Sequence, residues 1–141
     1  ITSLAIGYDQ PIDTNQASCV ASAIYFEARD QSLQGQAAVA QVILNRSVKR
    51  NKTPCEVVMQ RKQFSFTLVP YATRLESFKA ATLYDNQAKT KAAQVAIQAL
   101  TGSFEGMVKG STHYLNRAKA NPKWQYSFDN SIVIGDHTFL Y

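Results

Sequence analysis

Apolar side chains recur along the first part of the chain with the spacing of helices that bury one face. In residues 17–29 the apolar positions are Ala17, Val20, Ala21, Ile24 and Ala28. In residues 34–49 the same spacing includes Val39, Val42 and Ile43. Residues three or four positions apart share one face of a helix. We therefore expect two helices that pack against each other as a pair.

Capping signals predict further helices. Thr53 and Glu56 have the spacing of a capping box, and Pro54 occupies the first helical position, where its missing N–H costs nothing. Thr73 and Glu76 repeat the spacing of that box. Each pair satisfies backbone donors that a helix start would otherwise leave without partners. We expect a helix to begin at each pair.

The pattern changes in the last third of the chain. A longer helix is predicted over residues 86–100, with an alanine-rich apolar side, and Gly102 ends it. Two β-rich runs follow at 132–134 and 137–141, and the Gly-Asp pair between them is typical of a hairpin turn. Residues 112–115 are a candidate third strand.

These elements predict an α+β fold: a mainly helical domain with a small antiparallel sheet near the C-terminus. The 141 residues suit one domain, 1–141, and 45% hydrophobic residues suffice for a core. Residues 1–16 are expected to form an N-terminal arm. No apolar run approaches the roughly 18 residues of a membrane helix, and no signal peptide is visible, although a leader or domain preceding Ile1 can have been removed. A groove between helices and sheet is the expected ligand site.

Charge and cysteines restrict the partners. The net charge of +5 favours polyanions such as nucleic acid, membrane headgroups or the bacterial cell wall, but the cations are scattered in pairs and form no nucleic-acid-binding block. Cys19 and Cys55 form no CxxC motif, so a zinc thiolate site is not expected. A disulfide and two buried thiols both remain open. The two distant histidines predict no metal site, and no cofactor is expected.

One glutamate lacks a structural explanation. Of the four glutamates, Glu56 and Glu76 belong to capping boxes and Glu105 lies in a loop flanked by glycine, which leaves Glu27. Glu27 falls on or beside the apolar stripe of its helix, where a carboxyl loses hydration and keeps its proton more readily. A carboxyl that holds a proton near neutral pH is what cleavage of a glycosidic bond requires.

Glu27 also has a purely structural interpretation. Arg46 occupies an equivalent place on the second helix and could neutralise a half-buried Glu27 as an ion pair. Such a pair would make Glu27 a poorer acid, so the two hypotheses differ in the protonation that they predict. The spacing of the residues leaves both open.

Other candidates are weaker when taken singly. His113 lies in a predicted strand, where a histidine is more often structural than functional. Trp124, with Tyr114 and Phe128 near it, could form a platform for sugar rings, or simply pack on a sheet. The alternation of polar and aromatic residues over 63–67 fits a segment that lines a cleft or an ordinary edge segment.

The order of these pieces resembles the cell wall hydrolase family of the spore-cortex-lytic enzymes, which has related domains in phage lysins. The resemblance covers nearly the whole chain from about residue 18. The matching segments are AIYFEAR at 23–29, GQAAVA at 35–40, VILNR at 42–46, PCEVV at 54–58, QFS at 63–65, GSTHY at 110–114, Trp124 and IGDHTF at 134–139. After THY the family commonly continues with Asn-Pro, whereas this chain has LNR.

The resemblance implies a lysozyme-like fold related to lytic transglycosylases. It implies cleavage of the β-1,4 bond between N-acetylmuramic acid and N-acetylglucosamine in peptidoglycan, at the bacterial cell wall and by a monomer. Glu27 matches the family's catalytic acid, and the lack of an evident second carboxylate fits a single-acid mechanism. Gln63, Ser65, His113, Tyr114 and Trp124 are the expected substrate-binding residues.

Three other functions are kept as alternatives. A hydrolytic muramidase would cut the same bond with water. A non-catalytic wall-binding module would hold glycan while Glu27 is merely paired with Arg46. A nucleic-acid-binding domain would need a continuous cationic face, which the scattered lysines do not favour. We therefore expect peptidoglycan glycan strands as the partner, with neither nucleic acid binding nor membrane insertion.

Overall fold

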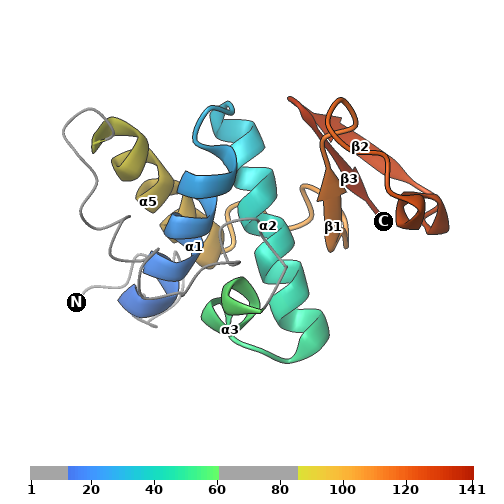
Figure 1. Ribbon diagram of the computed structural model, residues 1–141. Coiled ribbons are helices and arrows are strands. Elements are labelled where there is room, and N and C mark those ends of the chain that lie inside the picture. Colours follow the sequence, from blue (N-terminus) through green and yellow to red (C-terminus); the bar gives the residue numbers. More distant parts are fainter. Residues whose placement is uncertain (1–12, 61–85) are drawn as a thin grey trace.

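The computed structural model describes residues 13–60 and 86–141, and every structural statement refers to these (Figure 1). The predicted capping box at Thr73 and Glu76, and the candidate residues Gln63 and Ser65, lie outside the described residues, as does most of the expected N-terminal arm. Four helices and a small sheet form the described part of the chain.

Helix α1 (Thr14–Ala28) carries Glu27 in its last turn. Its N-cap is Asp13, whose carboxylate accepts from the backbone N–H of Asn15 at 2.9 Å and of Gln16 at 3.2 Å. The helix therefore begins inside the segment 1–16 that was expected to be an arm, and that expectation is wrong for its last residues. The apolar pattern could not place this start, because the first turn is polar and an aspartate cap fixes it.

Helices α2 (Leu33–Arg50) and α3 (Pro54–Met59) follow as predicted. The capping box of α3 is complete: Glu56 N–H donates to Thr53 Oγ1 at 3.1 Å, and Thr53 N–H donates to Glu56 Oε1 at 2.8 Å. The bonds from Thr53 lower the pKa of Glu56. The box thus fixes the start of α3 at Thr53.

A disulfide joins α1 to α3 and resolves the alternative that the sequence left open. Cys19 and Cys55 are bonded, with Cα atoms 5.1 Å apart. Both residues are buried. The bond therefore fixes α3 against the middle of the helix that carries Glu27.

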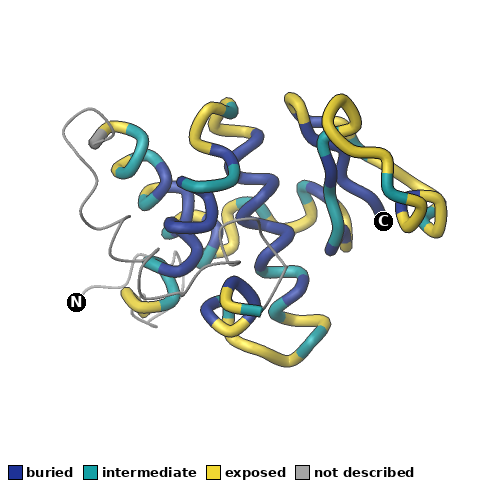
Figure 2. Tube along the Cα trace, in the orientation of Figure 1, coloured by how far each residue is buried: buried dark blue, intermediate teal, exposed yellow. Residues whose placement is uncertain are grey.

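Helix α2 lies between two halves of the core (Figures 1 and 2). One side of α2 packs with α1, α3 and α5 (Asn86–Leu100) through Ala37, Ala40 and Ile43. Another side packs on the sheet through Ala38, Val39 and Val42. These six side chains are almost fully buried. Helix α2 therefore sets the spacing between the helical part and the sheet.

The sheet consists of β1 (His113–Leu115), β2 (Ser131–Ile134) and β3 (His137–Leu140) in the order β1-β3-β2, all antiparallel. Tyr114 of β1 pairs with Phe139 of β3, and Ile134 of β2 pairs with His137 of β3. Because side chains alternate along a strand, these four residues share the face that packs toward the helices. The described fold is the predicted α+β arrangement, and the predicted hairpin and third strand are confirmed.

Candidate active site

Glu27 lies where the end of α1 meets the sheet. Its side chain is half-buried, and the next residue, Ala28, is fully buried in one cluster with Ile134 and Phe139. Directly after the helix, the guanidinium of the C-cap residue Arg29 lies 4.7 Å from the centroid of the buried Tyr25 ring, which braces the last turn of α1. The carboxyl is therefore presented from a rigid element at the boundary between the two parts of the fold.

Tyr114 is close enough to Glu27 for the two groups to interact electrostatically. Its ring stacks on Phe139 with centroids 5.3 Å apart and meets His137 edge-on at 5.0 Å. Burial and the negative charge of Glu27 raise the pKa of Tyr114, and the positive charge of Arg46 opposes part of that shift. The phenol therefore keeps its proton at neutral pH and can donate a hydrogen bond.

Arg46 is the cation of this group. It is 5% exposed, and its Nε donates to the carbonyl oxygen of Thr112 at 2.6 Å, one residue before β1 begins. Burial lowers the pKa of Arg46 to about 10, against the opposing effects of Tyr114 and Glu27. It therefore stays charged at neutral pH. Arg46 therefore anchors the backbone before β1, and the charge of Glu27 favours its cationic form.

His137 is a member of the site that the sequence did not single out. The side chain is 9% exposed, and its Nδ1 has no hydrogen-bond partner in the described part of the chain. Burial lowers the pKa of His137, although Asp136 and Glu27 favour its charged form. Strand parity could have indicated it, because His137 lies two residues before Phe139 and so shares its face.

His113 and Trp124 form a second group, on the opposite face of the sheet from Tyr114. The His113 ring lies 5.3 Å from Trp124, which belongs to the short 3-10 helix η3 (Lys123–Ser127), and 5.2 Å from Phe128. Trp124 is 43% exposed. Burial and the positive charges of Arg46, Arg50 and Lys49 lower the pKa of His113. This group therefore combines an exposed indole with an imidazole on which positive charges act.

The structure thus brings Glu27 and Tyr114 together, and separately His113 and Trp124. Gln63 and Ser65 are outside the described residues. Within residues 13–60 and 86–141, no group of three histidine, cysteine or acidic side chains could hold a metal ion. None of the described helices is long and apolar enough to cross a membrane.

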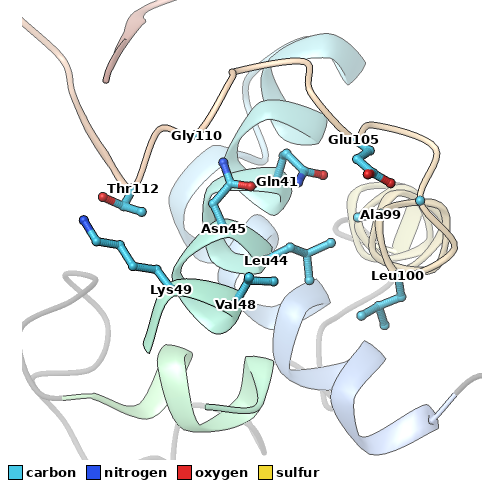
Figure 3. Close-up of a pocket in the computed structure, with 11 residues that line it drawn as sticks. Gln41, Leu44, Asn45, Val48, Lys49, Ala99, Leu100, Glu105, Gly110 and Thr112 are labelled. Carbon is cyan, nitrogen blue, oxygen red and sulfur yellow. Dashed lines mark hydrogen bonds between the residues drawn. The ribbon is translucent and has the colours of Figure 1, made fainter. Parts of the chain in front are cut away.

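A cavity of about 550 Å³ lies elsewhere, between α2, the end of α5 and the loop that leads to β1 (Figure 3). Leu44, Asn45 and Val48 point into it from α2, and Glu105 borders it from the loop. Arg46 lies about 100° around the helix from Asn45 and about 160° from Leu44. Arg46 therefore lies on a different side of α2 from the cavity.

Asn45 closes this side of α2 with a structural contact. Its Nδ2 donates to the carbonyl oxygens of Lys109 at 3.1 Å and Ser111 at 2.8 Å, and its Oδ1 accepts from Gln41 at 3.0 Å. Asn45 and Arg46 together hold the segment before β1 against α2. These two residues of the VILNR segment therefore fix the backbone that precedes Tyr114.

Comparison with known proteins places the chain in a family. Residues 30–140 match the family described as Cell Wall Hydrolase, and Glu27 lies just before that match. No curated protein matches the sequence.

Solved structures agree with the family match. The chain is similar to the catalytic domain of the germination-specific lytic transglycosylase SleB from Bacillus anthracis, at 26% identity and a TM-score of 0.67, over 95% of this chain and 100% of that one. It is also similar to the catalytic domain of the Bacillus cereus SleB protein, at 25% identity and a TM-score of 0.66, over 94% of each chain. The chain therefore belongs to the cell wall hydrolase family and is a cell-wall-degrading enzyme.

Proposed function

We propose that the protein cleaves the β-1,4 bond between N-acetylmuramic acid and N-acetylglucosamine in peptidoglycan as a lytic transglycosylase, with Glu27 as acid and then base. The observation that carries this is the half-buried Glu27 carboxyl at the end of α1, electrostatically coupled to Tyr114, Arg46 and His137. The likeness to SleB lytic transglycosylase catalytic domains supports the reaction type.

In the first step, protonated Glu27 donates its proton to the glycosidic oxygen, and the bond from that oxygen to C1 of the muramic acid breaks. The sugar gains oxocarbenium character, and Glu27 becomes a carboxylate. That carboxylate and the substrate's own acetamido group stabilise the positive charge. The phenol of Tyr114 can donate a hydrogen bond to an oxygen of the substrate or of Glu27.

In the second step, the Glu27 carboxylate removes the proton of the C6 hydroxyl of the same sugar. The C6 oxygen forms a bond to C1, which gives a 1,6-anhydro ring and restores the protonated acid. No water is consumed, so one carboxyl serves both steps. The charge of Arg46 favours the intermediate carboxylate, because opposite charges attract in a partly buried site.

The test is digestion of purified peptidoglycan followed by mass spectrometry of the soluble muropeptides. We expect 1,6-anhydro products from the wild type and a loss of at least about 100-fold in rate for Glu27→Gln, which keeps the size of the side chain and removes the transferable proton. Glu105→Gln is the matched control, because Glu105 is the carboxyl beside the separate cavity, which Glu27 does not line. It should retain wild-type activity.

Each other product pattern points to a different function. Reducing muramic acid ends would identify a hydrolytic muramidase that acts on the same bond. Wall binding without any product, equal in wild type and Glu27→Gln, would identify a non-catalytic binding module. Loss of activity in Glu105→Gln alone would place the reaction in the other cavity and contradict the assignment of Glu27.

We also propose that Trp124 and His113 bind the glycan strand outside the catalytic group. Exposed indole rings stack on sugar rings, and Trp124 is exposed and contacts His113. Trp124→Ala should slow digestion of insoluble peptidoglycan several-fold and leave digestion of short soluble glycan fragments unchanged. Equal loss on both substrates would place Trp124 in the catalytic group, and no loss on either would make it structural.

Gln63 and Ser65 enter the proposal through the family motif alone, as groups that orient the acetamido and hydroxyl groups of the substrate. We further propose that the enzyme acts as a monomer at the bacterial cell wall. Replacement of Gln63 by alanine should raise KM for soluble fragments, measured by steady-state kinetics. An unchanged KM would remove Gln63 from the substrate-binding set.

A further inference from the structure

The turn after α1 touches the turn between β2 and β3 through one pair of side chains, Gln31 and Asp136. Gln31 Nε2 donates to Asp136 Oδ2 at 2.9 Å, and the backbone N–H of Asp136 donates to Gln31 Oε1 at 3.3 Å. Both ends of the amide are therefore used, one on a side chain and one on the backbone. Two bonds of opposite direction fix the hairpin turn more firmly than either bond alone.

Two glycines make room for this amide. A Cβ at Gly135 would lie 2.7 Å from Gln31 Oε1, and Gly135 has a φ of +60°, which side chains rarely adopt. A Cβ at Gly35 would lie 3.1 Å from the Cβ of Gln31. Gln31 is therefore held closely between the start of α2 and the hairpin turn.

The backbone of Gln31 is itself tied to the end of α1. Its N–H donates to the carbonyl oxygen of Ala28 at 3.0 Å, and the fully buried Gln36 reaches toward the carbonyl oxygens of Arg29 at 3.5 Å and of Gln31 at 3.4 Å. Glu27 directly precedes Ala28. These hydrogen bonds therefore fix the hairpin turn relative to the end of α1, which carries Glu27.

At the other end of the contact, Asp136 is followed directly by His137. Side-chain hydrogen bonds do little to fix the His137 ring, because its buried Nδ1 has no partner among the described residues. Its place depends on the backbone of β3 and on the ring contact with Tyr114, 5.0 Å away. Whatever holds Asp136 in position therefore also holds His137 and, through that ring, Tyr114.

We propose that Gln31 and Asp136 are positioning residues, whose hydrogen-bonded pair holds His137 and Tyr114 beside Glu27 and so sets the rate of the chemical step. The expected effect of this pair on turnover rests on the proposed function. The contact itself can be tested without turnover.

The pKa of His137 is the quantity that can be measured without turnover. Asp136, Glu27 and Asp30 favour its cationic form and Lys119 opposes it, yet burial has the largest effect and lowers the pKa of His137. If the pair is broken and the ring gains access to water, the pKa of His137 should rise toward its ordinary value of 6.5. The protein has two histidines, so NMR titration can follow His137 once a His113→Gln variant has assigned the other signal.

The decisive experiment exchanges the amide and the acid. Gln31→Glu sets two carboxylates against each other and removes the donor, whereas Asp136→Asn keeps an oxygen that can accept from Gln31. The double variant Gln31→Glu with Asp136→Asn restores a donor on residue 136 and an acceptor on residue 31. We expect kcat on soluble glycan fragments to fall by about 10- to 100-fold in Gln31→Glu with KM nearly unchanged, because a displacement near 1 Å can cost that much.

Asp136→Asn and the double variant should stay close to the wild type in kcat, and the pKa of His137 should rise in Gln31→Glu only. A double variant that is as slow as Gln31→Glu would mean that the new charge near Glu27, and not the lost contact, causes the effect, which overturns the proposal. An unchanged kcat and His137 titration in Gln31→Glu would overturn it as well. Asp136→Ala, which keeps the backbone bond, replaces Gln31→Glu if that variant does not fold.

Failure of the proposed function has a different signature. In that case the wild type would give no product and would equal Glu27→Gln, while the His137 titration would still separate Gln31→Glu from the double variant. The NMR result then decides whether the pair holds the hairpin turn. The activity result decides whether the reaction depends on it.

Discussion

Around Glu27, burial and charge leave three neighbours in different protonation states at neutral pH. Tyr114 keeps its proton because burial raises its pKa, and Arg46 stays cationic with a pKa of about 10. His137 is neutral because burial lowers its pKa below 6.5. The carboxyl is thus surrounded by a donor, a fixed positive charge and an imidazole that adds no second charge. These three neighbours set the electrostatic environment of Glu27.

The two histidines predict how stability changes with pH. Both have a pKa in the folded state below the ordinary value of 6.5, so between these values the unfolded chain binds more protons than the folded protein. The stability that the two neutral histidines contribute should therefore be present above the ordinary pKa of 6.5 and decrease as the pH falls below it. Urea unfolding at several pH values measures this. His137→Gln should flatten the slope, and a slope that persists in a variant lacking both histidines would contradict the assignment.

Gly135 predicts a local cost at the hairpin turn. Gly135→Ala would add a Cβ 2.7 Å from Gln31 Oε1 at a backbone φ of +60°. We expect a loss of about 1 to 3 kcal/mol in the free energy of unfolding, measured by chemical denaturation. Gly110→Ala is the matched control, because its Cβ would meet nothing within 4 Å. Equal stability of the two variants would show that the turn yields without cost.

At the scale of the elements, α1 is attached at two places to other parts of the fold. The disulfide joins it to α3, and the turn that follows it contacts the hairpin through Gln31 and Asp136. Helix α2 adds Arg46, which fixes the backbone before β1. Glu27 therefore stands on a helix whose middle and end are each attached to a different part of the fold.

Loss of the disulfide should lower stability substantially. Cys19 and Cys55 are 36 positions apart, and closing a loop of this size stabilises the folded state by about 3 to 4 kcal/mol in the chain-entropy model. We expect the double variant Cys19→Ala with Cys55→Ala to unfold roughly 10 °C lower, measured by calorimetry. Reduction of the wild type should have a similar effect and should not affect the variant. An unchanged Tm would mean that helix packing alone holds α3.

The helices could be predicted from the sequence because apolar spacing and capping residues act locally. The strands could be located for the same reason, but their order could not, because nothing local makes β3 the central strand. Elimination among the four glutamates made Glu27 the candidate acid, and the family motif made Tyr114 a candidate substrate-binding residue. His137 was missed as a site residue, and the contact between Gln31 and Asp136 could not be foreseen, because it joins residues 105 positions apart.

At the scale of the whole molecule, net charge governs how the enzyme meets its substrate. The chain carries +5, and an anionic cell wall would attract it over roughly 10 Å at moderate salt. Raising the salt from about 0.05 M to about 0.5 M should slow digestion of insoluble peptidoglycan several-fold, because screening shortens that range. Short soluble fragments serve as the control, and their digestion should change little. Equal slowing of both would point to an effect of salt on the catalytic group.

The order of the strands determines when, during synthesis, the protein can become active. The strand β3 is the last of the described strands to leave the ribosome, yet both β1 and β2 pair with it. A nascent chain that has already formed the Glu27 helix therefore lacks the side of the site that carries His137, and Tyr114 has no strand to pair with. Nascent chains should therefore be unable to cut glycan until translation has passed β3. The cell that makes the protein is then not exposed to an active but incomplete chain.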